Sequence, residues 1–108
     1  MSLDFYIKQN DSSPIIRANL RGAGNTSLNL SAATVSFRMQ KSSGDNVVQG
    51  SAEIFDPSEG TVQYIWAPGD TSVSGVYLAE FEVTYADGKV ESFPNVGYIQ
   101  VNIKPELS

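Results

Sequence analysis

Three glutamates in the second half of the chain, Glu80, Glu82 and Glu91, are the side chains best suited to acid–base chemistry. A glycosidase needs two carboxylates about 5–9.5 Å apart across a sugar cleft, and neighbours on one strand face could meet that distance. The dipeptide Asp87-Gly88 predicts a two-residue hairpin turn, which places all three glutamates on one outer face. Such a face has no cleft and nothing to raise a carboxyl pKa. We therefore expect a solvated strand face, or a patch that contacts a partner protein, and no catalytic residues.

The same hairpin exposes an aromatic side chain. Its register pairs Glu82 with Phe93 and so places Phe93 on the outer face beside the acids. An exposed aromatic next to Pro94 either covers a sheet edge or forms part of a protein interface. We predict Phe93, with Glu80, Glu82 and Glu91, as partner-binding residues.

Two further aromatic residues raise the choice between a binding site and a core. Trp66 is the only tryptophan and shares a strand face with Val62 and Tyr64, which predicts core packing. The alternative is a platform on which a sugar ring stacks. Tyr77 follows Gly75 at the start of a strand, where a tyrosine in a sandwich often hydrogen-bonds back across the preceding corner. We predict structural roles for Trp66 and Tyr77.

The amino-acid composition removes the commonest catalytic and metal-binding groups. The chain has no cysteine and no histidine, which excludes a thiolate nucleophile, a zinc–thiolate site and a Ser-His-Asp triad. Turn aspartates form no EF-hand loop, although a calcium site assembled from separate loops stays open; they are Asp45, Asp56, Asp70 and Asp87. We expect no enzyme activity and no cofactor, and we assign no metal site.

The charge balance bears on possible partners. Seven basic and twelve acidic side chains give a net charge of −5. Proteins that bind nucleic acid need a basic surface to displace counterions from phosphates. The acidic balance therefore argues against DNA, RNA and anionic membranes as partners.

The elements that must hold these residues are short strands. Apolar residues recur with period two in runs of about five to ten residues, separated by Gly, Pro, Asn, Asp and Ser. Residues 77–85 and 35–39 show the alternation most clearly. About seven or eight strands with one apolar face each predict an all-β, immunoglobulin-like antiparallel β-sandwich. Residues 1–108 are expected to form one such domain.

Spaced motifs along nearly the whole chain resemble a known family. In the second half these are Trp66-x-x-Gly69-Asp70-Thr71, Tyr77-x-x-Glu80-Phe81, Asp87-Gly88-Lys89 and Phe93-Pro94-x-x-Gly97-Tyr98. The first half adds Phe5-x-Ile7-x-x-Asn10-Asp11 and the run from Leu30 to Met39. Together they resemble the N-terminal domain of the phage baseplate upper protein family, found in tailed phages and prophages of Gram-positive bacteria.

The resemblance implies a structural role in the virion. The family's domain is an immunoglobulin-like sandwich that docks onto the tail or baseplate, while other segments hold receptor-binding proteins, and it brings no catalytic residues. The implied location is the virion tail or baseplate, after synthesis in the bacterial host cytoplasm. Many members continue into further segments, so the chain is an isolated module, a truncated piece of a longer protein or a small stand-alone relative.

Two functions follow as hypotheses. The first is a non-enzymatic assembly module of a phage or prophage tail baseplate, with other baseplate proteins and copies of itself as partners, that supports host-receptor binding. The second is a carbohydrate-binding or adhesion module that uses Trp66 and nearby tyrosines on cell-wall sugar. An enzyme that works through Glu80, Glu82 or Glu91 is the least favoured.

Overall fold

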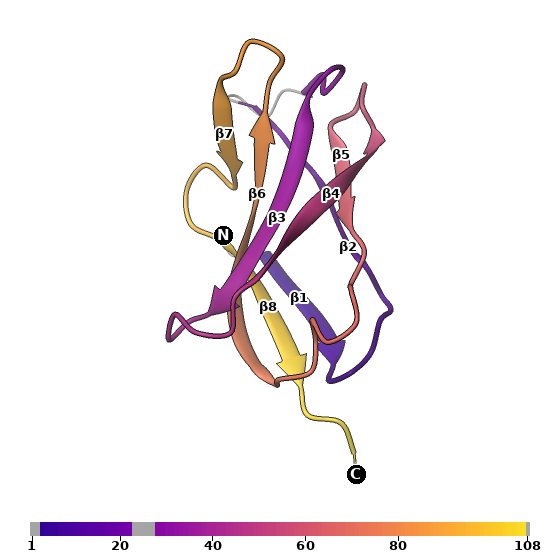
Figure 1. Ribbon diagram of the computed structural model, residues 1–108, viewed down its shortest axis with the longest axis vertical. Helices are drawn as coiled ribbons and strands as arrows, with labels where there is room; N and C mark the ends of the chain where they lie inside the picture. The colour runs from indigo at the N-terminus through magenta and orange to yellow at the C-terminus, as the bar shows by residue number, and fades with distance from the viewer. Residues whose placement is uncertain (1–2, 23–27, 108) are drawn as a thin grey trace.

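The structure is a computed structural model, which describes residues 3–22 and 28–107 (Figure 1). These residues contain eight strands and no helix that is long and apolar enough to cross a membrane. The strands are β1 (Leu3–Lys8), β2 (Ile16–Asn19), β3 (Thr34–Lys41), β4 (Val48–Asp56), β5 (Thr61–Tyr64), β6 (Gly75–Thr84), β7 (Val90–Phe93) and β8 (Ile99–Lys104).

The long strands form where the sequence alternates between apolar and polar residues. Successive side chains of a strand point to opposite faces, so one apolar row can be buried while the polar row meets solvent. In β3 the buried row is Val35, Phe37 and Met39, and in β6 it is Tyr77, Ala79, Phe81 and Val83. The period-two prediction therefore locates both strands and their inner faces.

The strands form a sheet that folds back on itself. Their hydrogen-bonded order is β1-β8-β6-β3-β4-β5-β2, and β7 also pairs with β6. β4 pairs with β3 through its first half and with β5 through its second half, where a bulge lies between Ile54 and Asp56. A bulge bends its strand, and β4 crosses the molecule from β3 to β5 (Figure 1). The all-β prediction is confirmed, whereas the immunoglobulin-like arrangement stays a prediction.

One strand pair corrects the prediction of an antiparallel sheet. β1 runs parallel to β8, with Leu3 beside Ile99 and Lys8 beside Lys104. The two strands come from opposite ends of the chain. Because no short hairpin joins them, nothing forces the antiparallel direction that a tight turn imposes.

The hairpin between β6 and β7 corrects the predicted register. The N–H of Gly88 donates to the carbonyl of Tyr85, and the N–H of Tyr85 donates to the carbonyl of Lys89. Gly88 has φ +89°, but Asp87 is not in the positive-φ region that a two-residue type I′ turn requires. The loop therefore has three residues, a turn followed by a left-handed glycine, and the pairing shifts by one position.

A shift of one residue turns every side chain of β7 to the other face of the sheet. Phe93 pairs with Phe81 instead of Glu82, and only 4% of Phe93 is exposed. Glu91 pairs with Val83, a buried residue. The prediction that Phe93 is an exposed aromatic on the outer face is therefore wrong.

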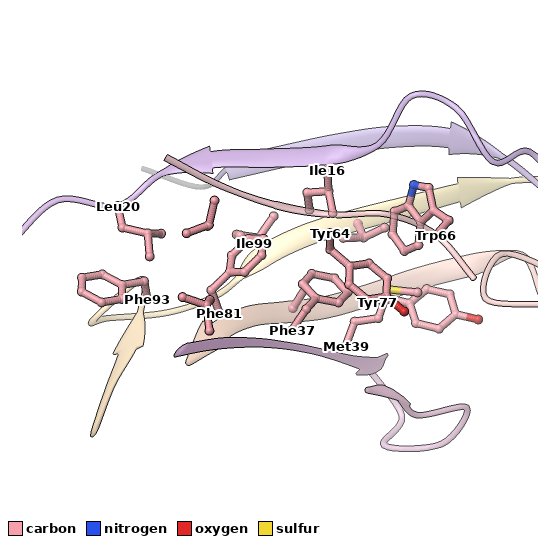
Figure 2. Close-up of a cluster of buried hydrophobic side chains, with 14 of the residues drawn as sticks. Ile16, Leu20, Phe37, Met39, Tyr64, Trp66, Tyr77, Phe81, Phe93 and Ile99 are labelled. Atoms are coloured by element: carbon pink, nitrogen blue, oxygen red, sulfur yellow. The ribbon is translucent and has the colours of Figure 1, made fainter. Parts of the chain in front are cut away.

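Aromatic rings form the centre of the core. Phe37 stacks on Tyr64 with ring centroids 4.4 Å apart and planes 17° apart. The rings of Trp66 and Phe37 meet edge to face with centroids 5.9 Å apart. The ring of Phe81, on β6, has its centroid 5.2 Å from that of Phe37. Figure 2 shows Ile16 reaching this layer from the side opposite Phe37. The two halves of the folded sheet thus meet through side chains of β3, β5 and β6.

Tyr77 combines a buried ring with a hydrogen-bonded hydroxyl. None of its surface is exposed. The hydroxyl donates to the carbonyl of Val73 at 2.7 Å and accepts from Nδ2 of Asn46 at 2.9 Å. The bond to Val73 spans four residues and ties the start of β6 to the corner before it, as expected for a corner tyrosine.

The substitution Tyr77→Phe tests this arrangement. It keeps the ring but leaves the Val73 carbonyl and the Asn46 amide without their shared partner, so we expect the free energy of unfolding to fall by about 1–2 kcal/mol. Urea denaturation measures the difference. Tyr98→Phe is the matched control, because Tyr98 is 54% exposed and should change stability little. Equal stability of both variants would contradict a role for the Tyr77 hydroxyl.

Candidate functional site

The acidic outer face is smaller than the sequence predicts. Glu80 and Glu82 lie on β6 between buried residues, so both point away from the core. Glu80 lies opposite Arg38 of β3. Glu80 and Arg38 line a shallow cavity of about 160 Å³ with Gln40, Leu78 and Tyr98. This polar surface offers charged groups to a partner but does not enclose a substrate.

Glu91 lies apart from the other two glutamates. Its pairing with Val83 places it on the face that carries the core, close to the turn of the β6–β7 hairpin. The hydroxyl of Tyr85 donates to Glu91 at 2.8 Å, and Nδ2 of Asn95 donates to it at 3.1 Å. The predicted trio is therefore divided. Glu80 and Glu82 share the outer face, while Glu91 belongs to a separate polar cluster.

Tyr64 and Tyr85 each donate a hydrogen bond to a carboxylate, and the pKa of each phenol is raised. Burial, followed by the hydrogen bond and the charge of Glu91, raises the pKa of Tyr85 to about 12. Burial likewise raises the pKa of Tyr64, helped by a 2.6 Å hydrogen bond to Asp70. A phenol with a raised pKa stays protonated at neutral pH. Each tyrosine therefore donates a structural hydrogen bond and is not poised to act as a base.

The turn aspartates stabilise their own loops. Asp70 accepts from the Tyr64 hydroxyl and from the N–H of Ala67. Asp56 accepts from Ser58, and Asp45 accepts from Ser43, a bond that lowers the pKa of the Asp45 carboxyl. In residues 3–22 and 28–107 no group of three acidic side chains could hold a metal ion. The sequence did not reveal the link from Asp70 to Tyr64, although the Pro-Gly-Asp turn marked the position.

Trp66 lines a cavity of about 150 Å³ with Pro68 and Thr71 but exposes almost none of its surface to a ligand. It is 5% exposed, and its Nε1 donates to the carbonyl of Pro14 at 2.9 Å. Rings of Phe5, Phe37 and Tyr64 surround it at centroid distances of 5.5–6.1 Å. A sugar could stack on this indole only if the core opened.

An apolar opening lies between the edge strands β1 and β2. Cavities of about 220 and 320 Å³ share Leu3, Ala18 and Ile99 in their walls. Phe93 lines the smaller cavity, and Phe5 lines the larger one. Phe93 thus faces a recess of the core where the folded sheet fails to close, not the acidic outer face. Sequence reasoning missed this opening because it depends on which strands are left at the sheet edges.

The raised pKa of Tyr85 predicts an alkaline loss of stability. Below pH 10 the phenol is protonated in both the folded and the unfolded chain. Between pH 10 and about 12 the unfolded chain releases this proton while the folded chain holds it, so the free energy of unfolding falls as pH rises. Tyr85→Phe should show a shallower fall in urea denaturation at pH 9, 10.5 and 11.5. The same slope in both proteins would show that the raised pKa is not a property of the fold.

Comparison with known proteins gives two results. The family model of the BppU N-terminal domain, the N-terminal domain of the baseplate upper protein, matches residues 2–103. The crystal structure of CopC from Methylosinus trichosporium OB3b is similar, with a TM-score of 0.56 and 17% identity over 99% of this chain and 89% of that one. This likeness shows a shared fold alone. No curated protein sequence matches the chain.

The match covers both halves of the chain, including the motifs around Trp66, Tyr77 and Asp87 that carried the resemblance. It confirms that resemblance, and the baseplate family suggests other phage tail and baseplate proteins as partners. The chain belongs to the BppU N-terminal domain family and is a structural protein of the phage tail baseplate.

Proposed function

We propose that the chain is a non-enzymatic docking module of the baseplate, which binds other baseplate proteins and copies of itself and so supports host-receptor binding. The observation that carries the proposal is the family match over residues 2–103. Synthesis in the host cytoplasm and assembly into the virion follow from such a role.

The side-chain chemistry supports docking over catalysis. The residues that suggested acid–base chemistry are either solvated, as Glu82 is, or hydrogen-bonded to neighbouring side chains, as Glu91 is. Within the described part of the chain no buried side-chain polar atom lacks a hydrogen-bond partner. The exposed apolar and charged surface is suited to contact with other molecules.

The outer face of β6 is the predicted contact for other baseplate proteins. Glu80 and Glu82 point outward there, and Tyr98 exposes half of its surface beside them. Aromatic side chains and arginine are enriched at protein interfaces, and Tyr98 and Arg38 lie together beside Glu80 on this face.

Binding to baseplate proteins tests the proposal directly. We expect the chain to form a complex with purified tail or baseplate proteins encoded beside it, seen as a co-eluting species in size-exclusion chromatography with light scattering. Glu80→Lys with Glu82→Lys should weaken that complex, because it reverses the charge of the outer face. Asp87→Lys is the matched control in the exposed hairpin loop. No complex with any of these proteins would overturn the docking role.

Tryptophan fluorescence tests the carbohydrate-binding alternative. Because Trp66 is buried among aromatic rings, we expect a blue-shifted emission that cell-wall glycans leave unchanged. Free tryptophan amide provides the exposed reference. Quenching that saturates with added glycan would favour the alternative over the docking module.

A further inference from the structure

Within residues 3–22 and 28–107, β1, β2 and β7 each pair with a single strand, and their outer edges differ in how well they are protected. β2 and β7 have four residues each, with Pro14 shortly before β2 and Pro94 directly after β7. Proteins commonly blunt exposed edges with short strands and proline, which lacks a backbone donor. β1 has six residues and no proline. It is the edge best suited to accept another strand.

The backbone of β1 has hydrogen-bonding groups available on its free side. In a parallel pair, alternate residues direct both backbone groups at the neighbouring strand. The N–H of Gln9 donates to the carbonyl of Lys104, which places the odd-numbered residues on the β8 side. Asp4 and Tyr6 then direct N–H and C=O outward, where no hydrogen bond from residues 3–22 or 28–107 meets them.

The side chains of this edge are complementary to themselves. Asp4, Tyr6 and Lys8 share the solvent face, and Tyr6 is 59% exposed. If a second β1 pairs antiparallel with Tyr6 opposite Tyr6, Asp4 of each copy lies opposite Lys8 of the other. Cross-strand neighbours of opposite charge stabilise a sheet, and like charges destabilise it. This register therefore creates two attractive pairs and no repulsive one.

The same register fits the hydrogen bonds and the apolar face. Opposed Tyr6 residues both point their backbone groups at the shared edge, so they form a hydrogen-bonded pair. On the inner face, Phe5 of one copy lies opposite Ile7 of the other. Leu3, which is 50% exposed beside the larger cavity, gains a neighbouring strand. A strand added at this edge would cover apolar surface that the fold alone leaves in contact with water.

We propose that two copies of the chain associate by antiparallel pairing of their β1 strands about Tyr6, which joins their sheets into one continuous sheet. The occupant of this edge is a second copy of the same chain. The inference rests on the self-association part of the proposed function. Docking to other baseplate proteins through the β6 face is independent of it, so the two can fail separately.

Charge reversal tests the register. Asp4→Lys and Lys8→Glu each turn both cross-strand pairs from attraction to repulsion, and each should weaken self-association about tenfold in sedimentation equilibrium. An equimolar mixture of the two variants should associate again, because every cross-strand pair between unlike copies then joins one lysine to one carboxylate. The double variant should also recover association. A monomeric wild-type chain, or a dimer that neither reversal weakens, would overturn the proposal.

Cross-linking gives a second measurement that does not depend on charge. The chain has no cysteine, so Tyr6→Cys introduces a single thiol. Hydrogen-bonded antiparallel residues have Cα atoms about 5.5 Å apart, within the range that a disulfide bridges. Mild oxidation should cross-link Tyr6→Cys into a dimer but leave Tyr98→Cys, the exposed control, monomeric. Equal cross-linking of both, or none of Tyr6→Cys, would overturn the β1 register even if the chain still binds other baseplate proteins.

Discussion

The stack of Phe37 on Tyr64 is the contact on which the fold depends most. Phe37 comes from β3 and Tyr64 from β5, so the 4.4 Å stack joins the two halves of the folded sheet. Gly50 makes the contact possible, because a Cβ at that position would lie 3.2 Å from the Tyr64 ring. The Tyr64 hydroxyl then reaches Asp70 and fixes the turn that leads toward β6. Ring packing in the core thus determines the position of a surface loop.

Strand positions could be predicted from the sequence because they depend on local alternation. The buried rows of β3 and β6 follow from period two alone, and Trp66 and Tyr77 lie in the core as their patterns indicate. The register of β7 could not be predicted, since it depends on one backbone angle. Asp87-Gly88 fits both a two-residue and a three-residue loop, and the φ values that separate them reflect the whole hairpin. The resulting shift of one residue in the pairing of β7 places Phe93 in the core and not on the surface.

The candidate site shows a different limit of sequence reasoning. Glu80 and Glu82 could be placed on the outer face because their strand alternates. Their separation from Glu91 follows from the shifted register of β7, whereas the opening between β1 and β2 depends on which strands pair across the chain. Pairing between Leu3 and Ile99 joins residues at opposite ends of the sequence. No local pattern encodes such a contact, so the sequence alone cannot identify the free edges.

Proteins with little sequence identity can share this architecture. CopC has a similar fold at 17% identity, and a sheet that folds on itself constrains only the inward-facing row of each strand. The outward row and the edges are free to vary without loss of the core. In this chain the outward-facing row of β1 places Asp4 and Lys8 two residues before and two residues after Tyr6. Such symmetry adds nothing to the core of one molecule, whereas at an edge it determines which strand, and in which register, can be added.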